Sequence, residues 1–378
     1  MNFIKKNLKT SEKLSILSHA SQYDLACSCG TRDDEHRRRS KENKWIYPVT
    51  MQNGGTTFLF KTLLSNECVN NCKYCPLRIN SDVARASLLP QELAKTFLEY
   101  YNRGVVSGLF LSSGMTINPD ATMERINAAA AILRRSNFKG YIHLKVIPGA
   151  SEQAIRKSLS LATAVSLNIE TAGEKNFKEL STTKNYLNDI MRPMHLISEL
   201  TKRGSQFAGI HQTTQFVVGA TKETDKEILD SIWQLYKELR LNRIYFSAYQ
   251  RGLGASDLYG ELSFNTNSDL LSREHRLYQA DWLIRKYGFS AAEIPLESSG
   301  NLSLTTDPKE LWTMQHPEFF PVNVNKADKF KLLRVPGLGL VMVNRIINFR
   351  ESGYRIRALG DLGRVTKTLS KALPYIVF

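Results

Sequence analysis

The sequence predicts an α/β protein in which an open barrel of parallel strands precedes a basic, helical C-terminal region. Between about residues 56 and 250, short β-type segments alternate with amphipathic helical segments, the pattern of repeated βα units. Residues 321–378 instead contain helical segments rich in Lys and Arg. With 378 residues, 42% of them hydrophobic, the chain can form a large core and two or three domains.

Six strands are expected in the barrel, and several of them alternate between polar and apolar residues. In one of them, Ser166, Asn168 and Glu170 share a face, and their apolar neighbours take the other face. A polar face inside a helix-covered sheet indicates a cavity with polar contents, so we expect an open barrel with a ligand inside. The expected strands span residues 56–64, 108–114, 141–147, 164–170, 209–219 and 243–249.

Helices are expected between these strands. Residues 89–104 have Pro at an early helical position and Gly at the end, the usual start and stop signals of a helix. Residues 221–241 begin with Thr221 and an acidic first turn, which the helix dipole favours. Both segments therefore fit the βα alternation.

Three of the five cysteines lie together in the segment NECVNNCKYC. Cys68, Cys72 and Cys75 follow the first barrel strand, on a loop at the end where barrel enzymes carry their chemistry. We expect a cytoplasmic protein, since no apolar run has the length of a membrane span and the first residues lack the apolar stretch of a secretory signal. In that reducing compartment, metal ligands or catalytic thiols are expected rather than disulfides.

Three thiolates suit two inorganic groups. A zinc site would need a fourth ligand, such as Cys27 or Cys29. An iron–sulfur cluster held by three cysteines instead leaves one iron free to bind a substrate, and we favour this interpretation. Cys27 and Cys29 themselves have three interpretations: a second metal site, catalytic or redox thiols that donate a hydrogen atom, or buried small side chains.

The cysteine triad and the six strands together resemble the radical S-adenosylmethionine (radical SAM) superfamily and its partial (β/α)6 barrel of TIM type. The resemblance implies a 4Fe–4S cluster on Cys68, Cys72 and Cys75, whose open iron binds S-adenosylmethionine (SAM). It also implies that one electron from the cluster cleaves SAM to methionine and a 5′-deoxyadenosyl radical, which abstracts hydrogen from the substrate. An external electron donor such as a flavodoxin or a ferredoxin is implied as well.

The same resemblance assigns SAM contacts to the strand ends. The motif of Gly-Gly-Glu type at the second strand reads Ser-Ser-Gly here, so hydroxyl or carbonyl groups would replace the carboxylate. Gly219 and Tyr249 also have structural alternatives, in which the glycine only ends a strand and the tyrosine fills a layer of the barrel interior. The SAM-binding residues expected are Ser112, Ser113, Gly114, Ser166, Asn168, Glu170, Gly219 and Tyr249. Inward polar residues expected to contact the substrate are His143, Lys145, His211, Gln212 and Gln215.

Near the C-terminus, residues 327–353 are expected to form a helix, a tight turn and a second helix. A turn with Gly337 and Gly339 points backbone N–H groups outward at the start of the second helix, which suits a phosphate. The stretch resembles a helix-hairpin-helix motif, which binds the DNA backbone without reading sequence. Residues 354–376 resemble a second copy, with the hairpin glycines replaced.

Charge supports this nucleic-acid interpretation over a helical hairpin for subunit contact. Residues 321–378 contain eleven Lys or Arg and three Asp or Glu, so their net charge is 11 − 3 = +8 of the +15 of the chain. Phosphate contacts supply affinity without specifying sequence. The DNA-binding residues expected are Lys331, Arg334, Gly337, Gly339 and Arg345.

Segments across nearly the whole chain, among them YDLACS, GYIHLKVIPGAS and LLRVPGLG, resemble a family of radical SAM proteins assigned to DNA modification or repair. That resemblance implies DNA as the substrate, reached by a flipped nucleotide or an open strand, and a uracil-DNA glycosylase-like protein as a partner. The domains expected are an N-terminal extension (1–50), the barrel (51–290), a linker (291–320) and tandem helix-hairpin-helix motifs (321–378).

Two alternatives stay open from the sequence. A radical SAM enzyme of this construction could act on RNA or tRNA in place of DNA. A non-catalytic adaptor could hold zinc on the cysteines and recruit a glycosylase-like partner to DNA through its C-terminal hairpins.

Overall fold

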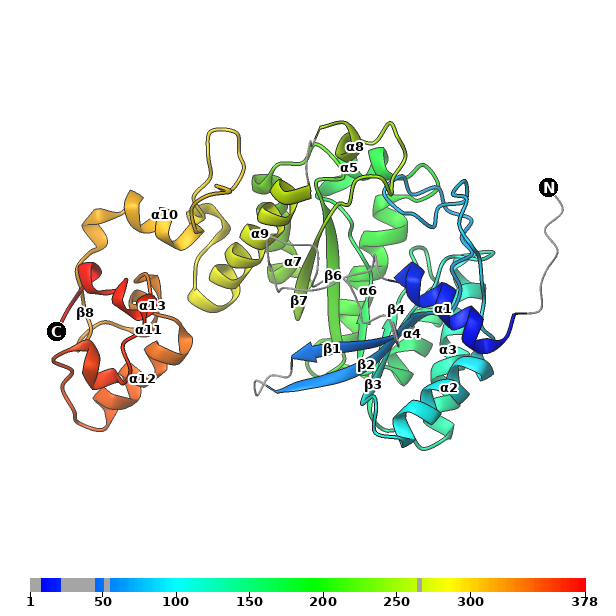
Figure 1. Ribbon diagram of the computed structural model, residues 1–378, viewed down its shortest axis with the longest axis horizontal. Coiled ribbons are helices and arrows are strands. Elements are labelled where there is room, and N and C mark those ends of the chain that lie inside the picture. Colours follow the sequence, from blue (N-terminus) through cyan, green and yellow to red (C-terminus); the bar gives the residue numbers. More distant parts are fainter. Residues whose placement is uncertain (1–7, 22–44, 51–54, 264–266) are drawn as a thin grey trace. The chain divides into compact units, whose positions relative to one another are not determined.

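The computed structural model describes residues 8–21, 45–50, 55–263 and 267–378, and Figure 1 shows its elements. The chain divides into two compact units. Unit 1 comprises residues 1–223 and 234–274, and unit 2 comprises residues 224–233 and 275–378. The division therefore passes through helices α7 (Asp225–Glu238) and α9 (Asn267–Tyr287).

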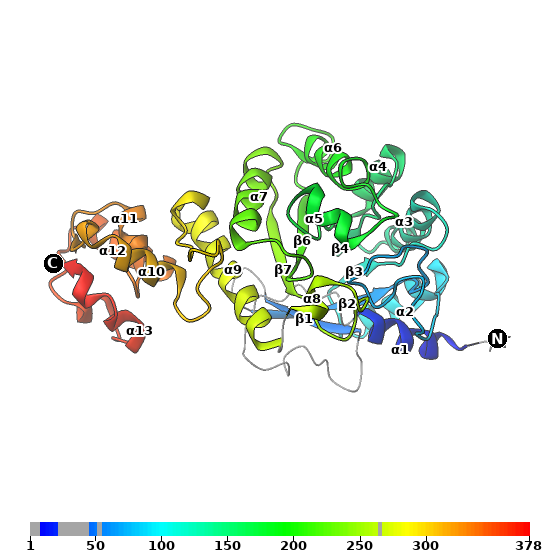
Figure 2. The ribbon, with the colours of Figure 1, turned by 90° about the horizontal axis from the view of Figure 1, so that it is seen from above.

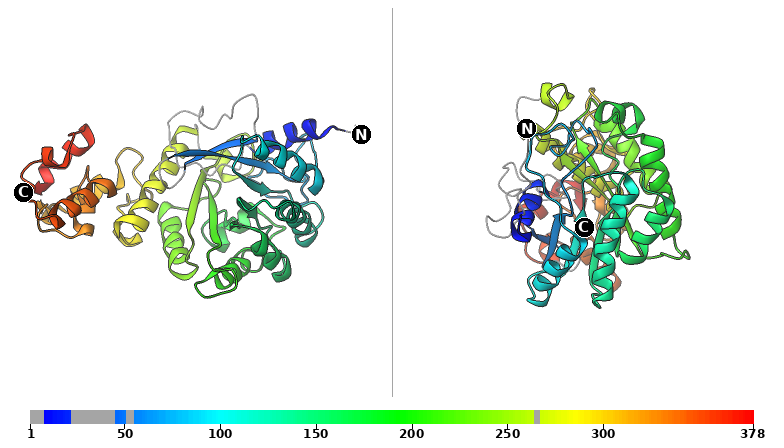
Figure 3. Two further views of the ribbon diagram at one scale, coloured as in Figure 1. Left: turned by 90° about the horizontal axis from the view of Figure 1, so that it is seen from below. Right: turned by 90° about the vertical axis from the view of Figure 1, so that its right-hand side faces the viewer.

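Unit 1 is built on a seven-stranded sheet in which the strands follow the order of the chain. β1 pairs antiparallel with β2, and all later neighbours pair parallel. Figures 2 and 3 show this sheet curved, with helices along its outer side, so the expected α/β class with a half-barrel is confirmed. The strands are β1 (Ile46–Thr50), β2 (Thr56–Leu63), β3 (Gly108–Ser112), β4 (Tyr141–Lys145), β5 (Ala164–Ser166), β6 (His211–Val218) and β7 (Arg243–Ala248). All six predicted strands are present, and β1 was not predicted.

The helices of unit 1 contact one another in sequence order around the sheet, α2 with α3, α3 with α4 and α4 with α6. α2 starts at Pro90, as its sequence predicts, whereas α7 starts at Asp225, later than the predicted 221. Thr224 and Glu227 form a reciprocal capping pair there, with Thr224 N donating to Glu227 Oε2 at 2.7 Å. The other elements are α1 (Thr10–Ala20), α2 (Pro90–Asn102), α3 (Pro119–Arg135), α4 (Glu152–Leu161), α5 (Gly173–Leu180), the π-helical η3 (Tyr186–Met191), α6 (Arg192–Thr201) and α8 (Tyr259–Leu262).

The alternation along the strands decides what faces the helices. Apolar side chains of the central strands are fully buried on the helix side, among them Phe60, Leu109, Leu111, Ile142, Leu144, Val165, Phe216, Ile244 and Phe246. The intervening polar residues face the concave side of the sheet. The predicted polar lining of the half-barrel is therefore confirmed for Lys145, Gln215 and Ser247, which line a pocket there.

β5 ends earlier than the alternation predicts because a side chain takes over its hydrogen bonds. The Thr214 hydroxyl donates to the Leu167 carbonyl at 2.7 Å and accepts from the Ile169 N–H at 2.9 Å. Regular pairing resumes only in an isolated bridge between Glu170 and Phe216. Glu170 adopts φ 68°, a left-handed conformation that is costly for a residue with a side chain.

Unit 2 contains two helices joined by a tight turn, as predicted for residues 327–353. The turn is built around Gly337, which has φ 81°, and buried Leu332, Leu338, Val343 and Ile346 pack beneath it. The predicted second copy contains only short helical pieces. Besides parts of α7 and α9, the elements are η4 (Ala291–Glu293), α10 (Pro308–Gln315), η5 (Pro317–Phe319), β8 (Val322–Asn323), α11 (Lys329–Arg334), α12 (Leu340–Glu351), η6 (Leu359–Leu362), α13 (Lys367–Ser370), η7 (Leu373–Tyr375) and β9 (Ile376–Val377).

The segment 291–320, predicted as a linker, contains η4, α10 and η5. The expected domain limits remain predictions. Within the described ranges, no helix combines the length and the apolar character needed to cross a bilayer.

Candidate functional site

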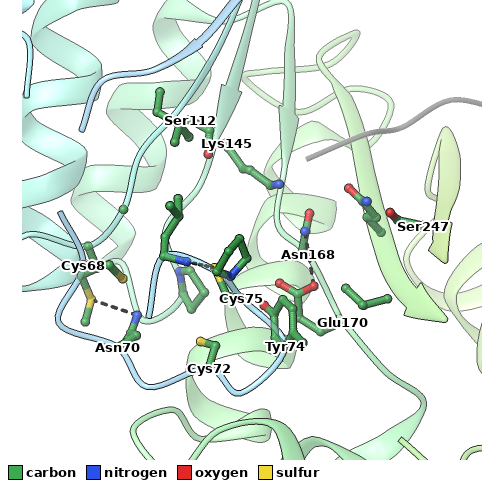
Figure 4. Close-up of a pocket in the computed structure, with 18 of the residues that line it drawn as sticks. Cys68, Asn70, Cys72, Tyr74, Cys75, Ser112, Lys145, Asn168, Glu170 and Ser247 are labelled. Carbon is green, nitrogen blue, oxygen red and sulfur yellow. Dashed lines mark hydrogen bonds between the residues drawn. The ribbon is translucent and has the colours of Figure 1, made fainter. Parts of the chain in front are cut away.

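A pocket opens at the C-terminal ends of the parallel strands of unit 1, and all three clustered cysteines line it (Figure 4). It encloses about 1210 Å³ of empty space that is continuous with solvent. Its walls come from the loop after β2, from the ends of β3, β4, β6 and β7, and from the segment after β5. This is the end of the sheet at which parallel α/β enzymes bind their ligands.

Two arginines hold the cysteine loop in shape. Arg85 donates four hydrogen bonds to carbonyl groups, to Asn66 at 2.6 Å, Leu77 at 2.9 Å, Arg78 at 2.9 Å and Ser81 at 3.1 Å. Arg78 in turn donates to the carbonyls of Cys75, Leu253 and Gly254 at 2.8 to 3.1 Å. The guanidinium fork suits this bridging of several acceptors.

The three thiols share one environment. Cys72 is buried, and Cys68 and Cys75 are partly buried. Burial, followed by the proximity of Cys72, raises the pKa of Cys75 to about 12. Such closely spaced thiols cannot all ionise without a cation, so their chemistry fits a positively charged inorganic group.

Most residues predicted to bind SAM meet around this pocket. Ser112, Ser113, Gly114, Asn168, Glu170 and Tyr249 all line it. Gly114 has a specific packing reason, since a Cβ at this position would lie 2.3 Å from the Glu67 carbonyl oxygen of the cysteine loop.

Two predicted residues lie elsewhere. Ser166 is one layer deeper, where its hydroxyl bonds with His143 Nε2 at 2.9 Å. Gly219 follows β6 with φ 82° and does not belong to the pocket lining among the described residues. Its contact with SAM stays a prediction.

Glu170 is the acidic group of the pocket. Its carboxylate accepts from Asn168 Nδ2 at 3.4 Å, and it forms a hydrogen bond with the Tyr74 hydroxyl. Figure 4 shows Tyr74, Asn168 and Glu170 side by side. Burial and the neighbouring Glu170 raise the pKa of Tyr74 well above its usual value, so the phenol stays protonated.

The five residues expected to contact a substrate lie in four different places. Lys145 and Gln215 line the pocket. His143 lies below it, within 3.1 Å of the Tyr141 hydroxyl and beside the ring of Phe110. The prediction is wrong for the orientation of Gln212, which donates to the Met194 carbonyl of α6 at 3.0 Å on the helix side of the sheet. His211 is exposed at the start of β6, at the opposite end of the strand from the pocket.

Lys184 is a pocket residue that the sequence reasoning missed. It lies in the segment between α5 and η3 and lines the pocket together with Cys72. Burial alone would lower the pKa of Lys184, but Cys72 and Glu170 raise it above its usual value, so the ammonium group stays charged. No strand period or spacing marks this position, so only the fold reveals it.

The hairpin of unit 2 brings some of the predicted DNA-binding residues to the surface. Lys331 is exposed, and Gly337 and Gly339 are partly exposed. Arg345 is tied to the Leu362 carbonyl. Arg334 is a correction, because its guanidinium pairs with Glu293 at 2.7 Å and lies over the rings of Phe289, Trp312 and Phe319, where a phosphate could not reach it without displacing them.

The donor chemistry of the loop suits an iron–sulfur cluster, because three thiolates hold such a cluster and leave one iron open. Among the residues that the structure describes, no group of three or more Cys, His, Asp or Glu side chains is arranged to hold a single metal ion. Cys27 and Cys29, the suggested fourth ligands of a zinc site, lie outside the described residues.

A known family matches the segment that carries the cysteine loop. Residues 62–235 match the family model described as the radical SAM superfamily. None of the curated proteins matches the chain. Among solved structures, the chain is similar to the FeFe-hydrogenase maturase HydG from Carboxydothermus hydrogenoformans, with 16% identity, a TM-score of 0.45, and coverage of 60% of this chain and 51% of that chain. A second is methylornithine synthase (PylB), with 13% identity, a TM-score of 0.46, and coverage of 72% and 74%.

This chain thus spans about half the length of the hydrogenase maturase. The match of residues 62–235 covers the cysteine loop, strands β3 to β6 and the pocket segments between them. These residues form a domain of the radical SAM superfamily, whose enzymes use a 4Fe–4S cluster and SAM.

Proposed function

We propose that this protein is a radical SAM enzyme that modifies or repairs DNA. Cys68, Cys72 and Cys75 hold a 4Fe–4S cluster in this proposal, and SAM binds beside it in the pocket. When bound, the two groups supply a 5′-deoxyadenosyl radical that abstracts hydrogen from the substrate, after an external donor such as a flavodoxin or ferredoxin provides one electron. A uracil-DNA glycosylase-like protein is the partner suggested by the sequence resemblance.

The observation that carries this proposal is the set of three thiols on one loop, held by two arginines, that lines a pocket together with polar side chains. The chain's own residues have three tasks there. The arginines keep the loop carbonyls in place, and Gly114 lets the end of β3 pack against that loop. Asn168 and Glu170 offer an amide and a carboxylate for the polar groups of SAM, and Lys145 and Gln215 line the remaining wall.

DNA is favoured as the substrate by the C-terminal part of the chain. Seven of its eleven basic residues are exposed and form no ion pair or side-chain hydrogen bond within the described part of the chain: Lys326, Lys329, Lys331, Arg355, Arg357, Arg364 and Lys367. Phosphate backbones attract such a surface independently of sequence. The turn between α11 and α12 adds backbone N–H groups at the start of a 12-residue helix.

The cluster is tested first. Anaerobically reconstituted protein is expected to contain iron and sulfide and to release 5′-deoxyadenosine from SAM when reduced, and Cys72→Ala is expected to lose both while remaining folded. The double variant Cys27→Ala/Cys29→Ala is the matched control, because it removes two thiols outside the triad. Zinc without iron in the wild type, lost in that double variant, would support the adaptor instead.

The DNA substrate is tested by binding at several fixed salt concentrations. Duplex DNA, single-stranded DNA and tRNA are compared for the wild type, Lys331→Ala and the control Lys157→Ala on α4. Lys331→Ala is expected to weaken DNA binding for all sequences and to reduce the slope against log salt by about 1. Binding to tRNA that exceeds DNA binding at every salt concentration would reject DNA in favour of RNA. Mass measurement of nucleosides from damaged and undamaged oligonucleotides then identifies the reaction.

A further inference from the structure

An open groove runs along α12 in unit 2, from its first turn at Val341 to Tyr354 beyond its last turn. It holds about 850 Å³ of space that is continuous with solvent. Its lining combines two amides, two aromatic rings and a guanidinium group, from Asn344, Asn348, Phe349, Tyr354 and Arg345. The groove thus begins beside the hairpin turn, but it offers side chains rather than the backbone N–H groups of that turn.

The end of α12 fixes Tyr354 in the groove. Gly353 has φ 81°, and its N–H donates to the Arg350 carbonyl at 3.0 Å. The Tyr354 N–H donates to the Phe349 carbonyl at 3.2 Å, which completes a Schellman motif. The usual apolar contact of that motif is here the Phe349–Tyr354 ring pair, with centroids 5.1 Å apart. Tyr354 is nevertheless 64% exposed, so much of a ring that the backbone holds in place is available to a ligand.

Two amides lie in the groove with these rings. Asn344 and Asn348 are four residues apart on α12, so they share one face of the helix, and both are exposed. An amide offers donors and an acceptor together, which is the combination that pairs with the edges of nucleobases. Rings and amides in one groove therefore suit a flat aromatic ligand with polar edges.

The charge around the groove favours nucleic acid over a protein segment. Residues 341–357 contain four arginines and one glutamate, so their net charge is 4 − 1 = +3. Arg355 and Arg357, within three residues of Tyr354, are both exposed. Stacking rings beside cations that attract phosphates are the features with which proteins bind single strands.

Only an unpaired base can use this groove. In a duplex the faces of a base are covered by its neighbours in the stack, whereas an unpaired base offers a free face and a free edge. α12 has 12 residues, so its ends lie about 18 Å apart. That distance corresponds to about five phosphates at the spacing of a stacked strand. A short single strand that starts at the hairpin turn can therefore follow α12 as far as Tyr354.

We propose that this groove binds an unpaired base of single-stranded DNA, so that the protein prefers DNA in which a duplex continues into a single strand. The inference rests on the proposed function, since it takes DNA as the nucleic acid. Phosphates at the hairpin turn supply affinity for any DNA, and stacking on Tyr354 adds affinity only for an unpaired base. Because every base has a π-face, the added affinity should be largely independent of sequence.

The experiment compares three DNA probes by fluorescence anisotropy, with full-length protein at one fixed salt concentration. One probe is a blunt duplex, and the second is the same duplex with a single-stranded extension of about six nucleotides, enough to span α12. The third carries that extension as abasic sites, which keep the phosphates but lack the bases. The wild type is expected to bind the second probe about tenfold more tightly than the blunt duplex, and to lose most of this gain on the abasic extension.

Variants assign the gain to the groove. Tyr354→Ala is expected to bind the intact extension no better than the abasic one, with its affinity for the blunt duplex within about twofold of the wild type. Tyr354→Phe keeps the ring and is expected to behave as the wild type. Leu373→Ala is the matched control, because Leu373 is another exposed apolar side chain of unit 2, at 52%, and lies outside the groove lining. Denaturant titration shows whether each variant is folded.

A direct measurement needs no variant. A 5-iodouracil base in the extension is expected to cross-link to Tyr354 on irradiation, and mass spectrometry of the digested protein locates the linked residue. If the base cross-linked only to residues of unit 1, it would be bound elsewhere and the inference would be wrong. Equal wild-type binding of the blunt and extended duplexes, or of the intact and abasic extensions, would overturn it too and leave the groove to a protein partner.

Failure of the proposed function looks different in the same experiment. Protein that binds tRNA but none of the three DNA probes would reject DNA as the substrate. Protein that binds all three probes equally would keep DNA as the substrate and lose only the role of the groove.

Discussion

The cysteine loop of unit 1 and the hairpin of unit 2 are both short connecting segments, yet different interactions hold them in shape. Guanidinium groups that bridge many carbonyls hold the cysteine loop. Close packing around a glycine and one buried lysine, Lys309, holds the hairpin, since Lys309 Nζ donates to the Leu338 carbonyl at 2.8 Å.

Lys184, beside the cysteine loop, and Lys309, beneath the hairpin, differ in how their surroundings shift their pKa values. Lys184 faces thiols and a carboxylate, which raise its pKa. Lys309 faces a carbonyl and the ring of Tyr287, and burial lowers its pKa to about 7. The lysine beside the cysteine loop thus stays charged, whereas Lys309 supports the hairpin through a hydrogen bond.

The largest effect is expected for Arg85→Met, which removes four hydrogen bonds from a charged donor to the cysteine loop. We expect the free energy of unfolding to fall by about 3 kcal/mol, because four carbonyls of a partly buried loop lose a charged donor. Denaturant titration and iron content measure the result. Arg135→Met, at an exposed position at the end of α3, is the control. If Arg85→Met and Arg135→Met had the same stability and iron content, the Arg85 hydrogen bonds would not be what holds the cysteine loop.

The next largest loss of stability is expected for Gly337→Ala. The residue has φ 81°, and a Cβ there would lie 2.3 Å from the Thr368 carbonyl oxygen, so we expect a loss of about 2 kcal/mol. Gly339→Ala is its partner in this test, because the nearest atom to its Cβ, the Tyr287 hydroxyl, is 3.4 Å away and the cost should stay within about 0.5 kcal/mol.

Gly339→Ala also sharpens the DNA proposal. If DNA phosphates approach this backbone, the variant should bind duplex DNA more weakly at unchanged stability. Unchanged affinity would mean that the hairpin is structural only.

The free energy of unfolding is expected to depend on pH because of Lys309. Its pKa is about 7 in the folded protein and about 10.4 in an unfolded chain, so between these values the unfolded chain binds more protons. Stability should therefore rise as the pH rises above 7, by at most about 1.4 kcal/mol per pH unit. Denaturant titrations of wild type and Lys309→Met, followed by Trp312 fluorescence, test this. A parallel pH dependence in both proteins would show that Lys309 does not cause it.

The smallest effect is expected for Asp257→Asn. This carboxylate pairs with Lys73 on the outside of the cysteine loop, with side chains 64% and 37% exposed. Surface ion pairs contribute little. We expect the denaturation midpoint and the cluster reduction to remain at wild-type values, and a clear shift in either would mean that outer charges control the loop as strongly as the arginines.

Much of the barrel was predictable because its signals are local. Alternation along a strand fixes which side chains face the helices, and this placed Lys145 and Gln215 correctly. The same rule failed for Gln212, which occupies a helix-facing position in β6 and binds a carbonyl of α6. The early end of β5 was also hidden, since it depends on the Thr214 hydroxyl of a neighbouring strand.

In the C-terminal part, composition correctly indicated a basic surface but could not show which cations are free. Arg334 has the charge and the position expected of a phosphate contact, yet Glu293 and aromatic rings surround it. Only packing distinguishes it from Lys331, which is exposed.

The sequence alone determined the cysteine triad, its place after the first barrel strand, the polar lining and the net charge, because spacing, alternation and composition are properties of neighbouring residues. The tertiary structure alone decided that Asn71 fastens the segment of Lys184 to the cysteine loop, and that Glu170 enters the pocket from a left-handed backbone. These contacts join residues far apart in the chain, and their geometry exists only after the strands have paired.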